Sequence, residues 1–413
     1  MASGNLTLAA RRLLSASAVR DRANRMLNNV IAGMSQHFAV DLVRLDPVCD
    51  YVVRVIRSSY ADLSVPPHAC WRHFEAGEID RWGMLVALKQ WPSPQALGAA
   101  AVDLAFVSVL MRGLAGPGWA YAEAATGETF ARAEGEAIAS LLMFAGGAFS
   151  SNPYDPLRVD ARALAGLTPA ELADGLQVSR SNQITGLEER VGLINRFGRM
   201  MSEFPSLFAV DDGLRPGGLI AYLEQAADPD GIEAPWLLEL LLGPLTAVMP
   251  GQFALGDIAL GDCWPHPRLV VGDATDGLVP FHQTAQWLTY SLIEPLVWAG
   301  FDLVDLDGLT APADPWNGSL LIDLGLLRLR DPAAVTATHQ YGDEIIVEWR
   351  ALTVALVDRI AEGARRRLGR QLDTFPLACV LEGGTVAAGR RLAREKRRDG
   401  RPALNVAPDS TIL

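Results

Sequence analysis

The sequence predicts a mainly α-helical protein, a multi-helical array of two lobes with a few short strands. Three observations predict this class. Long segments carry apolar residues at helical spacing, strand-like runs are few, and 413 residues with 50% hydrophobic content exceed what one core usually holds. Proline and glycine clusters at residues 209–218 and 261–267 mark expected changes of lobe. We therefore predict an N-terminal helical lobe over residues 1–208 and a C-terminal lobe over residues 209–413.

Several predicted helices have clear start signals. Ser93-Pro94 and Thr168-Pro169 each place a capping hydroxyl before a proline. Glu171 lies three residues after Thr168, which completes a capping box. The segments with helical spacing are Arg81–Lys89, Ser93–Arg112, Thr129–Phe144, Thr168–Leu176, Gly186–Glu203 and Pro235–Val248.

Apolar runs elsewhere predict strands and one buried helix. Strands are expected at Phe253–Leu260, Arg268–Val271 and Leu320–Leu324. The run Leu97–Met111 carries Asp103 and is shorter than the roughly 20 residues of a membrane span. It therefore predicts a buried helix and no membrane partner.

Charge and cysteine content restrict the class of protein. A net charge of −12 and a pI near 5.0 argue against nucleic-acid binding, although a small phosphorylated ligand needs only a local basic pocket. The four cysteines have no CxxC spacing, which favours reduced thiols and a cytoplasmic location. The arginine-rich first 25 residues favour an amphipathic helix, with an organellar transit segment as the alternative. His68, Cys70 and His73 match no zinc spacing, so we expect no metal and no cofactor.

Four long motifs occur in one order in the second half of the chain. They are DATDGLVPFHQTAQW from Asp273, DGLTAPADPWNGSLL from Asp307, DEIIVEWRALTVALVDRIA from Asp343 and PLACVLEGGTVAAGRRLA from Pro376. With the segments around His73 and Glu188, this series closely resembles the uracil-catabolism protein 4 family over nearly the whole chain. The resemblance implies a role in uracil degradation, a route whose intermediates include ribosylurea.

A more distant likeness concerns the segment from Phe281 to Arg350. Its order of motifs looks like that of the queuosine salvage proteins, helical N-glycosidases with a DNA-glycosylase-like fold. Asp314 stands where that family has the aspartate of an Ala-Asp-Tyr-Arg segment, but Pro315 and Trp316 replace the Tyr-Arg pair. Gln283 replaces a usual lysine, so no role of that lysine or arginine is carried over.

Together the two resemblances imply a hydrolase that cleaves the N-ribosidic bond of ribosylurea, with its 5′-phosphate as the favoured form. The expected partner is a small nucleoside- or nucleotide-derived substrate. Two alternatives stay open: a non-catalytic partner that binds a metabolite or scaffolds the ring-opening enzyme, and a pyrimidine nucleotide N-glycosidase.

Such hydrolysis builds positive charge on the sugar, which a fixed carboxylate stabilises. Asp314, in a proline-rich loop, is the first candidate for the catalytic carboxylate, with an ordinary turn aspartate as the alternative. Asp276 is the second candidate, and helix capping is its alternative.

Side chains on the predicted helix Phe281–Ile293 are candidates for substrate contact. His282, Gln286 and Tyr290 share one face at i, i+4 and i+8, and a glutamine suits the edge of a urea group. Trp287 lies beside them, as a stacking wall or as core. The other predicted substrate contacts are Asn317, Glu348, Arg350, His73 and Arg72, with a buried ion pair as the alternative for Glu348 and Arg350.

A phosphate site is predicted at the segment from Glu382. Gly383, Gly384 and Thr385 precede a predicted helix that carries Arg390. Glycines permit close approach to the backbone, and a helix N-terminus presents free N–H groups to an anion.

Overall fold

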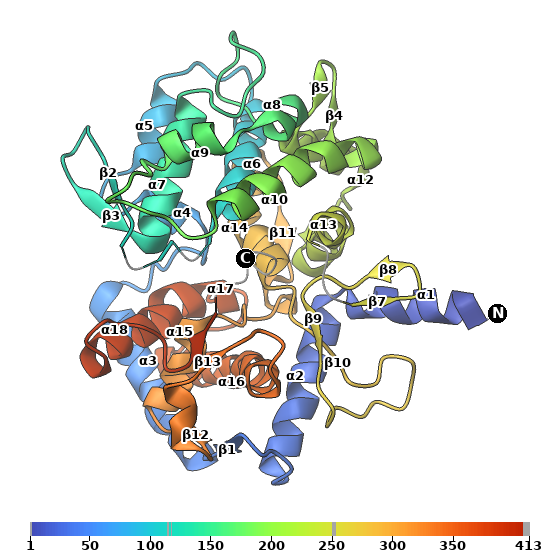
Figure 1. Ribbon diagram of the computed structural model, residues 1–413, viewed down its shortest axis with the longest axis vertical. Coiled ribbons are helices and arrows are strands. Elements are labelled where there is room, and N and C mark those ends of the chain that lie inside the picture. The colour runs from blue at the N-terminus through green and yellow to red at the C-terminus, as the bar shows by residue number, and fades with distance from the viewer. Residues whose placement is uncertain (1, 114, 117, 250–252, 408–413) are drawn as a thin grey trace.

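The computed structural model describes residues 2–113, 115–116, 118–249 and 253–407 (Figure 1). Helices form most of the described chain, and its strands are two or three residues long. Each described sheet has two strands. The predicted mainly α class is confirmed.

The upper half of the molecule in Figure 1 surrounds α6 (Pro94–Met111). Ser93 caps this helix through the Ala96 amide at 3.1 Å, with Pro94 in its first turn. Asp103 is fully buried, and its carboxylate binds Arg215 and accepts the Val159 amide at 2.8 Å. By length and apolar composition α6 alone among the described helices could cross a membrane, yet 72% of it is buried inside the protein. The predicted buried helix is confirmed.

Five of the other nine described helices of the upper half agree with the predicted segments to within a few residues, and the remaining four match none of those segments. The capping box of Thr168 and Glu171 is present as predicted. These helices are α4 (Trp71–Phe74), α5 (Arg81–Ala87), α7 (Arg132–Ala145), α8 (Ala161–Gly166), α9 (Pro169–Gly175), α10 (Leu187–Met200), α11 (Pro205–Phe208), α12 (Leu219–Ala226) and α13 (Ala234–Val248).

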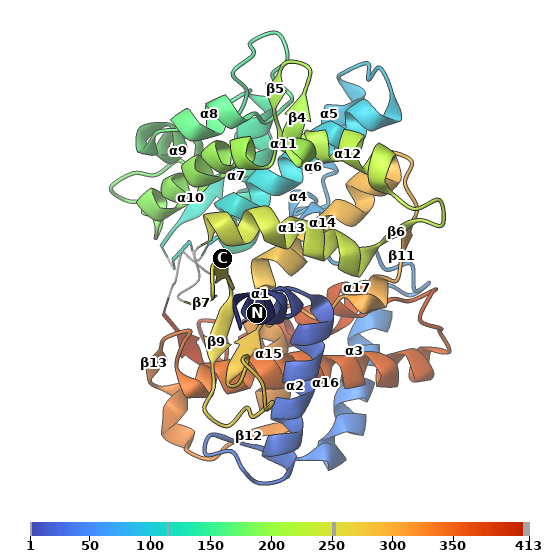
Figure 2. The ribbon, with the colours of Figure 1, turned by 90° about the vertical axis from the view of Figure 1, so that its right-hand side faces the viewer.

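The lower half is built around α16 (Glu344–Leu368), with α2 (Ala16–Ile31) and α3 (Leu45–Ser59) packed against it. Figure 2 shows α2 crossing α16 from the side. Because α2 and α3 lie on a helix of the last hundred residues, the packing crosses the boundary predicted between residues 208 and 209. The division into those two lobes stays a prediction.

Two further helices complete this half, and one joins it to the upper half. α15 (Pro315–Asp323) packs on α18 (Ala387–Lys396), which follows α17 (Leu377–Val380) through a π-helical segment, Leu381–Val386. α14 (Gln283–Trp298) starts near the lower half and packs along α6. α1 (Ala2–Leu13) lies outside both, against the β7–β8 hairpin.

Strands pair mostly as short antiparallel ladders. Residues 254–259 form a hairpin, close to the prediction, but residues 268–271 are a loop and Leu320–Leu324 belongs to α15 and its C-cap. Short apolar runs do not distinguish a strand from a buried helix, which explains the second error. The antiparallel pairs are β1 (Phe38–Val40) with β12 (Leu327–Leu329), β2 (Ala120–Ala122) with β3 (Thr129–Ala131), β4 (Ala209–Val210) with β5 (Gly213–Leu214), β7 (Ala254–Leu255) with β8 (Ile258–Ala259), and β9 (Cys263–Pro265) with β10 (Leu278–Pro280). The parallel pairs are β6 (Ile232–Glu233) with β11 (Leu303–Val304), and β13 (Thr338–His339) with β14 (Asn405–Val406).

Candidate active site

Asp314 lies at the start of α15, where it is the N-cap residue. One carboxylate oxygen, Oδ1, accepts the Trp316 amide at 2.7 Å, and Pro315 occupies the first helical position. Within the described residues no group bonds the other oxygen, Oδ2, and the side chain is half-buried. Asp314 therefore both caps a helix and keeps a free carboxylate oxygen.

The loop before Asp314 is fixed by the face of α14 that we predicted to bind substrate. The Gln286 side chain accepts the Thr310 amide at 3.0 Å and donates to the Thr310 hydroxyl at 2.5 Å. The Tyr290 hydroxyl donates to the Thr310 carbonyl at 3.2 Å. Both side chains are fully buried, and these bonds occupy them. We therefore correct the predicted roles of Gln286 and Tyr290 from substrate contact to positioning of the Asp314 loop.

Trp287, the neighbour of Gln286, is the centre of a packed group of cationic and imidazole side chains. The Arg112 guanidinium lies over the Trp287 ring at 4.6 Å from its centroid. The rings of His68 and His73 lie 4.5 and 5.8 Å away, centroid to centroid. Since Trp287 is only 5% exposed, it supports Arg112 and does not offer an open face to a ligand.

The charges of Asp314, Arg112 and Arg390 act on the pKa values of this group. Burial lowers the pKa of Arg112, and the Arg390 charge adds to that change. The Asp314 carboxylate opposes it most, followed by Glu136 and Glu134. Burial, and then the charges of Arg390 and Arg112, hold the pKa of His73 well below its ordinary value of 6.5. His73 is therefore a neutral imidazole at neutral pH. We call Asp314, Arg112, Arg390, His73 and Trp287 the interlobe cluster.

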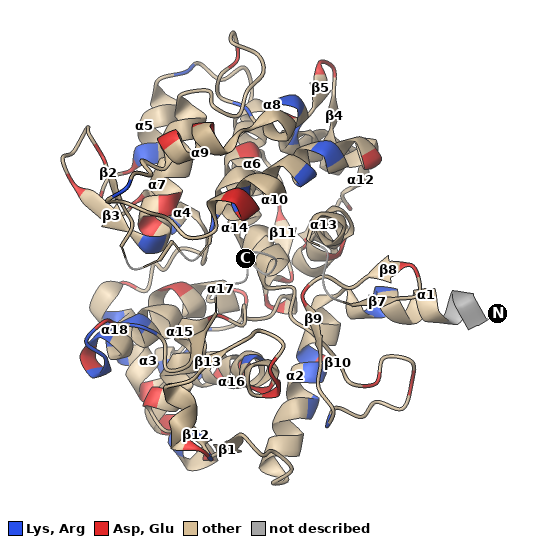
Figure 3. Ribbon diagram, in the orientation of Figure 1, with Lys and Arg blue, Asp and Glu red and all other residues tan. Residues whose placement is uncertain are grey.

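The interlobe cluster joins the two halves of the molecule. His73 lies on α4 and Arg112 at the end of α6, in the upper half of Figure 1, whereas Asp314 begins α15 and Arg390 lies on the basic α18, in the lower half (Figures 1 and 3). Arg390 of α18 bonds Glu134 of α7 at 3.2 Å, which is one direct link between the halves. The role of Arg390 in phosphate binding stays a prediction.

The glycines near Arg390 do not form the predicted phosphate site. Gly383 and Gly384 lie inside the π-helical segment that continues into α18, so no free helix N-terminus is present there. A Cβ atom on Gly383 would come within 2.9 Å of Val65, and one on Gly384 within 2.8 Å of Val52. The glycines thus permit close packing against α3 and the Val65 loop, and we correct their assignment. π-Helical turns are frequent at functional sites.

Two predicted residues near the cluster have polar groups without partners. Both amide atoms of Asn317 and the Thr385 hydroxyl are buried and have no hydrogen bond within the described residues. Because such groups cost free energy when unpaired, they are open to a water or a ligand. Their roles in substrate and phosphate binding stay predictions.

Sequence reasoning missed three functional candidates. Arg112 follows the apolar run of α6 and looked like an ordinary helix end. His68 and Glu382 are 314 positions apart, yet His68 Nδ1 lies 2.5 Å from Glu382 Oε2. A histidine held by a carboxylate can move protons, as catalytic histidines do. No local pattern could have found this pair.

Other predicted substrate contacts have structural partners. Arg350 forms a two-bond ion pair with Asp262, at 2.9 and 2.6 Å, and lies over Phe281. Glu348 bonds the Ser35 hydroxyl, and its other oxygen lies 3.5 Å from His266 Nε2. The alternative of a buried ion pair holds for Arg350, and Glu348 belongs to a buried polar network.

Three further predicted residues have structural partners, and their roles in the site stay predictions. His282 Nε2 contacts the Leu13 carbonyl at 2.8 Å, which ties α14 to α1. Arg72 forms a two-bond ion pair with Glu294, at 2.7 and 2.8 Å. Asp276 is exposed in the β9–β10 loop, where it accepts the Gly272 amide at 2.7 Å. The Gly272 and Val271 amides lower the pKa of Asp276, as expected for a loop-bridging carboxylate.

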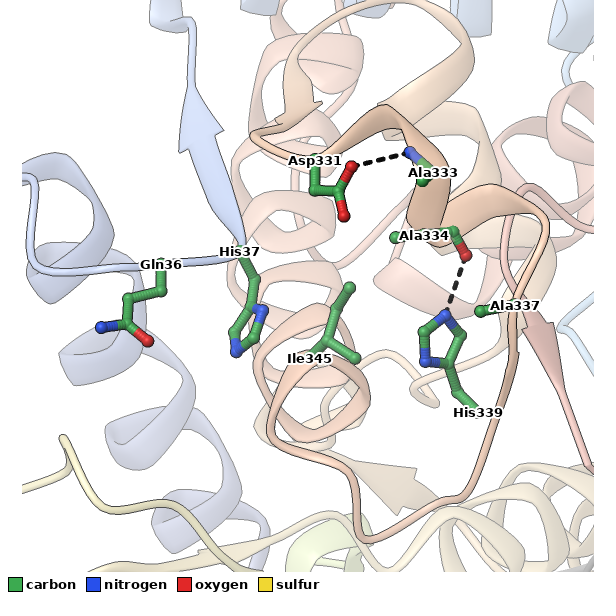
Figure 4. A pocket seen from close by; sticks show the side chains of 8 residues that line it. All are labelled: Gln36, His37, Asp331, Ala333, Ala334, Ala337, His339 and Ile345. Atoms are coloured by element: carbon green, nitrogen blue, oxygen red, sulfur yellow. Dashed lines mark hydrogen bonds between the residues drawn. The ribbon is translucent and has the colours of Figure 1, made fainter.

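A pocket of about 330 Å³ lies in the lower half, apart from these residues (Figure 4). Its polar lining includes His37, Asp331 and His339. Asp331 accepts the Ala333 amide at 2.9 Å, and His339 Nε2 contacts the Ala334 carbonyl at 2.9 Å. None of the predicted site residues lines this pocket.

Comparisons with known proteins cover nearly the whole chain. Protein urg3 of Schizosaccharomyces pombe is 32% identical over 411 residues, covering 97% of this chain and 98% of that protein. Uracil catabolism protein 4 of Lachancea kluyveri is 31% identical over 435 residues, with the same coverage of 97% and 98%. A family model described as "Protein of unknown function (DUF1688)" matches residues 12–413. The chain therefore belongs to this family, together with uracil catabolism protein 4.

Proposed function

We propose that this protein acts in uracil catabolism, as a hydrolase that cleaves the N-ribosidic bond of ribosylurea, with the 5′-phosphate as the favoured substrate. The name of a relative aligned along 97% of the chain supports the pathway. The likeness of the Asp314 segment to N-glycosidases supports the reaction class. The observation that carries the proposal is the free Asp314 oxygen, held within the interlobe cluster by α15 and by the Gln286–Thr310 bonds.

The reaction needs a carboxylate in this setting. Water adds its oxygen to the anomeric carbon, the bond from that carbon to the urea nitrogen breaks, and the nitrogen gains a proton. Positive charge grows on the sugar as the bond breaks, and a half-buried carboxylate stabilises it more strongly than a solvated one does. Asp314 Oδ2 can also accept the proton of the attacking water.

The test follows urea release from ribosylurea and from its 5′-phosphate. We expect urea from at least one substrate, and a loss of at least a hundredfold in kcat for Asp314→Asn, the scale of a lost acid–base group. Asp331→Asn is the matched control. Asp331 also precedes a proline and caps its helical turn through the amide two residues on, but it lies outside the interlobe cluster. The control should keep parental activity.

Three results would contradict the proposal. They are the absence of urea from both substrates, an Asp314→Asn variant as active as the parent, and an equal loss in both variants. Thermal stabilisation by ribosylurea phosphate without turnover would instead support a metabolite-binding partner. Base release from uridine monophosphate would support a nucleotide N-glycosidase.

A further inference from the structure

Arg112 differs from the other buried arginines of the upper half. Arg81 forms a two-bond ion pair with Glu123, and Arg190 pairs with Glu136 at 2.7 Å. The Arg112 guanidinium has no hydrogen bond or ion pair within the described residues, although it is half-buried between the two halves. A guanidinium carries five donors, and those of Arg112 are not among the buried unpartnered atoms of the described residues, so they stay open to solvent or to a ligand.

We infer that Arg112, together with Arg390, binds a phosphate monoester, the anionic end of a sugar phosphate. The inference names the ligand class for the proposed active site. It rests on the proposed function only for the identity of the sugar.

The packing of Arg112 on the Trp287 ring leaves the N–H donors of its guanidinium free. The face of the guanidinium lies over the Trp287 ring, at 4.6 Å from the ring centroid. Stacking on a ring occupies the face of a guanidinium but not its N–H edge. That edge is the part that bonds phosphate oxygens in pairs.

Asp314 does not neutralise Arg112 by direct contact. The carboxylate is near enough to affect the pKa of Arg112, yet no ion pair joins the two among the described residues. Glu136 and Glu134 act on Arg112 in the same direction, and among the described residues no ion pair joins Arg112 to any of the three carboxylates. A ligand with phosphate at one end and a reacting anomeric carbon at the other matches this separation, because that carbon becomes positive beside Asp314.

Arg390 supplies the second guanidinium from the opposite half. Only Nη1 of Arg390 has a described partner, Glu134 at 3.2 Å, and the two side chains are 28% and 35% exposed. Its other donors can turn to a ligand. A phosphate bound by Arg112 from above and Arg390 from below would link the two halves. His73 is neutral and does not serve as a third cation.

The test measures binding by calorimetry, without turnover, with ribose 5-phosphate, ribose and inorganic phosphate as probes. We expect ribose 5-phosphate to bind at least tenfold more tightly than ribose. Arg112→Gln and Arg390→Gln should each weaken its binding by about tenfold to a hundredfold, the effect of losing a hydrogen bond to a charged group. Arg112→Lys should recover part of the loss, since it keeps the charge but not the paired bonds.

Arg391→Gln is the control for loss of charge. Arg391 is the neighbour of Arg390 on α18, its side chain is 58% exposed, and it pairs with Glu395 at 3.0 Å. This variant should bind as the parent does. The NMR titration of His73 gives a second readout: bound phosphate should raise its pKa, because the anion offsets the charges of Arg112 and Arg390.

The inference is overturned if ribose and ribose 5-phosphate bind equally, if the parent binds neither, or if Arg112→Gln binds like the parent while keeping the parental thermal midpoint. These outcomes are separate from those for the proposed function. Phosphate binding without urea release would leave the inference standing and sink the hydrolase. Urea release without phosphate binding would leave the hydrolase standing and overturn the inference.

Discussion

Replacing Asp262 by asparagine tests the ion pair that joins the lower half to the start of α14. The Asp262 carboxylate receives two bonds from Arg350, the Gln283 amide at 3.0 Å and the Trp264 indole at 2.8 Å. The side chains of Arg350 and Asp262 are 3% and 10% exposed. Asparagine keeps the shape but leaves the Arg350 charge buried without a counter-charge.

The expected loss is large because the pair is buried. Removing one partner of such a pair costs about 3–5 kcal/mol. The unfolding entropy of a chain of 413 residues is about 0.9 kcal/mol/K, so the thermal midpoint should fall by about 3 to 6 °C. Glu362→Gln on α16 is the control: it removes a carboxylate from an exposed pair with Arg366, which contributes less than about 0.5 kcal/mol.

The same pair predicts a dependence of stability on pH. Burial acts to raise the pKa of Asp262, but the Arg350 charge and the hydrogen bonds outweigh it and hold the pKa below the ordinary 3.8. The stabilisation is therefore complete above that ordinary value and is lost as the pH falls through the folded-state pKa. Asp262→Asn should lack this acid-dependent component.

Thermal and urea unfolding at pH 7 and through the acid range measure both effects. A loss below about 1 kcal/mol, or one no larger than that of Glu362→Gln, would refute the reasoning from burial. An acid dependence equal to the parent's would refute the assignment of the pKa shift to this pair.

Two further predictions concern the interlobe cluster and its support. Gly389→Ala should destabilise the protein by about 1–3 kcal/mol in urea unfolding, because its Cβ would meet the Trp316 carbonyl oxygen at 2.1 Å and separate α15 from α18. His73 should make the free energy of unfolding fall as the pH drops below about 6.5, because the unfolded imidazole then binds a proton that the folded one does not. Unfolding of His73→Gln, measured between about pH 7 and 5, should therefore depend less on pH than that of the parent.

Each of these predictions has its own control and contrary outcome. Gly166→Ala introduces a methyl group with no neighbour within 4 Å, so it should be tolerated. Equal stability of the two alanine variants would contradict the close crossing of α15 and α18. For His73, identical pH profiles of parent and variant would show that the folded imidazole takes up its proton as the unfolded one does.

Local patterns predicted the helices better than they predicted the site. Ser93-Pro94 and the capping box at Thr168 fixed two helix starts, because capping depends on neighbours within three residues. The spacing of Gln286 and Tyr290 correctly put them on one face of α14. The sequence could not show that this face meets Thr310, because the meeting depends on how the chain returns after α14.

Gly383, Gly384 and Arg112 show the same limit of prediction from local sequence patterns. Gly383 and Gly384 do permit close approach, but the partner is α3 and the Val65 loop, not a phosphate. Arg112 becomes notable only through Trp287, which lies 175 positions later in the chain and on another helix. Arg112 is a candidate because it has no ionic partner among the described residues. A local sequence pattern cannot predict the absence of a partner.

The packing of α2 and α3 on α16 has a consequence for synthesis. Arg20 and Asp358 bond at 2.9 Å and are 338 positions apart, so this interface cannot form until almost the whole chain has been made. The helices from α4 to α13 are contiguous in sequence and can fold earlier, as domains do during translation. The apolar faces of α2 and α3 meanwhile stay uncovered. We therefore expect the first 59 residues to stay unpacked until residue 368 has left the ribosome.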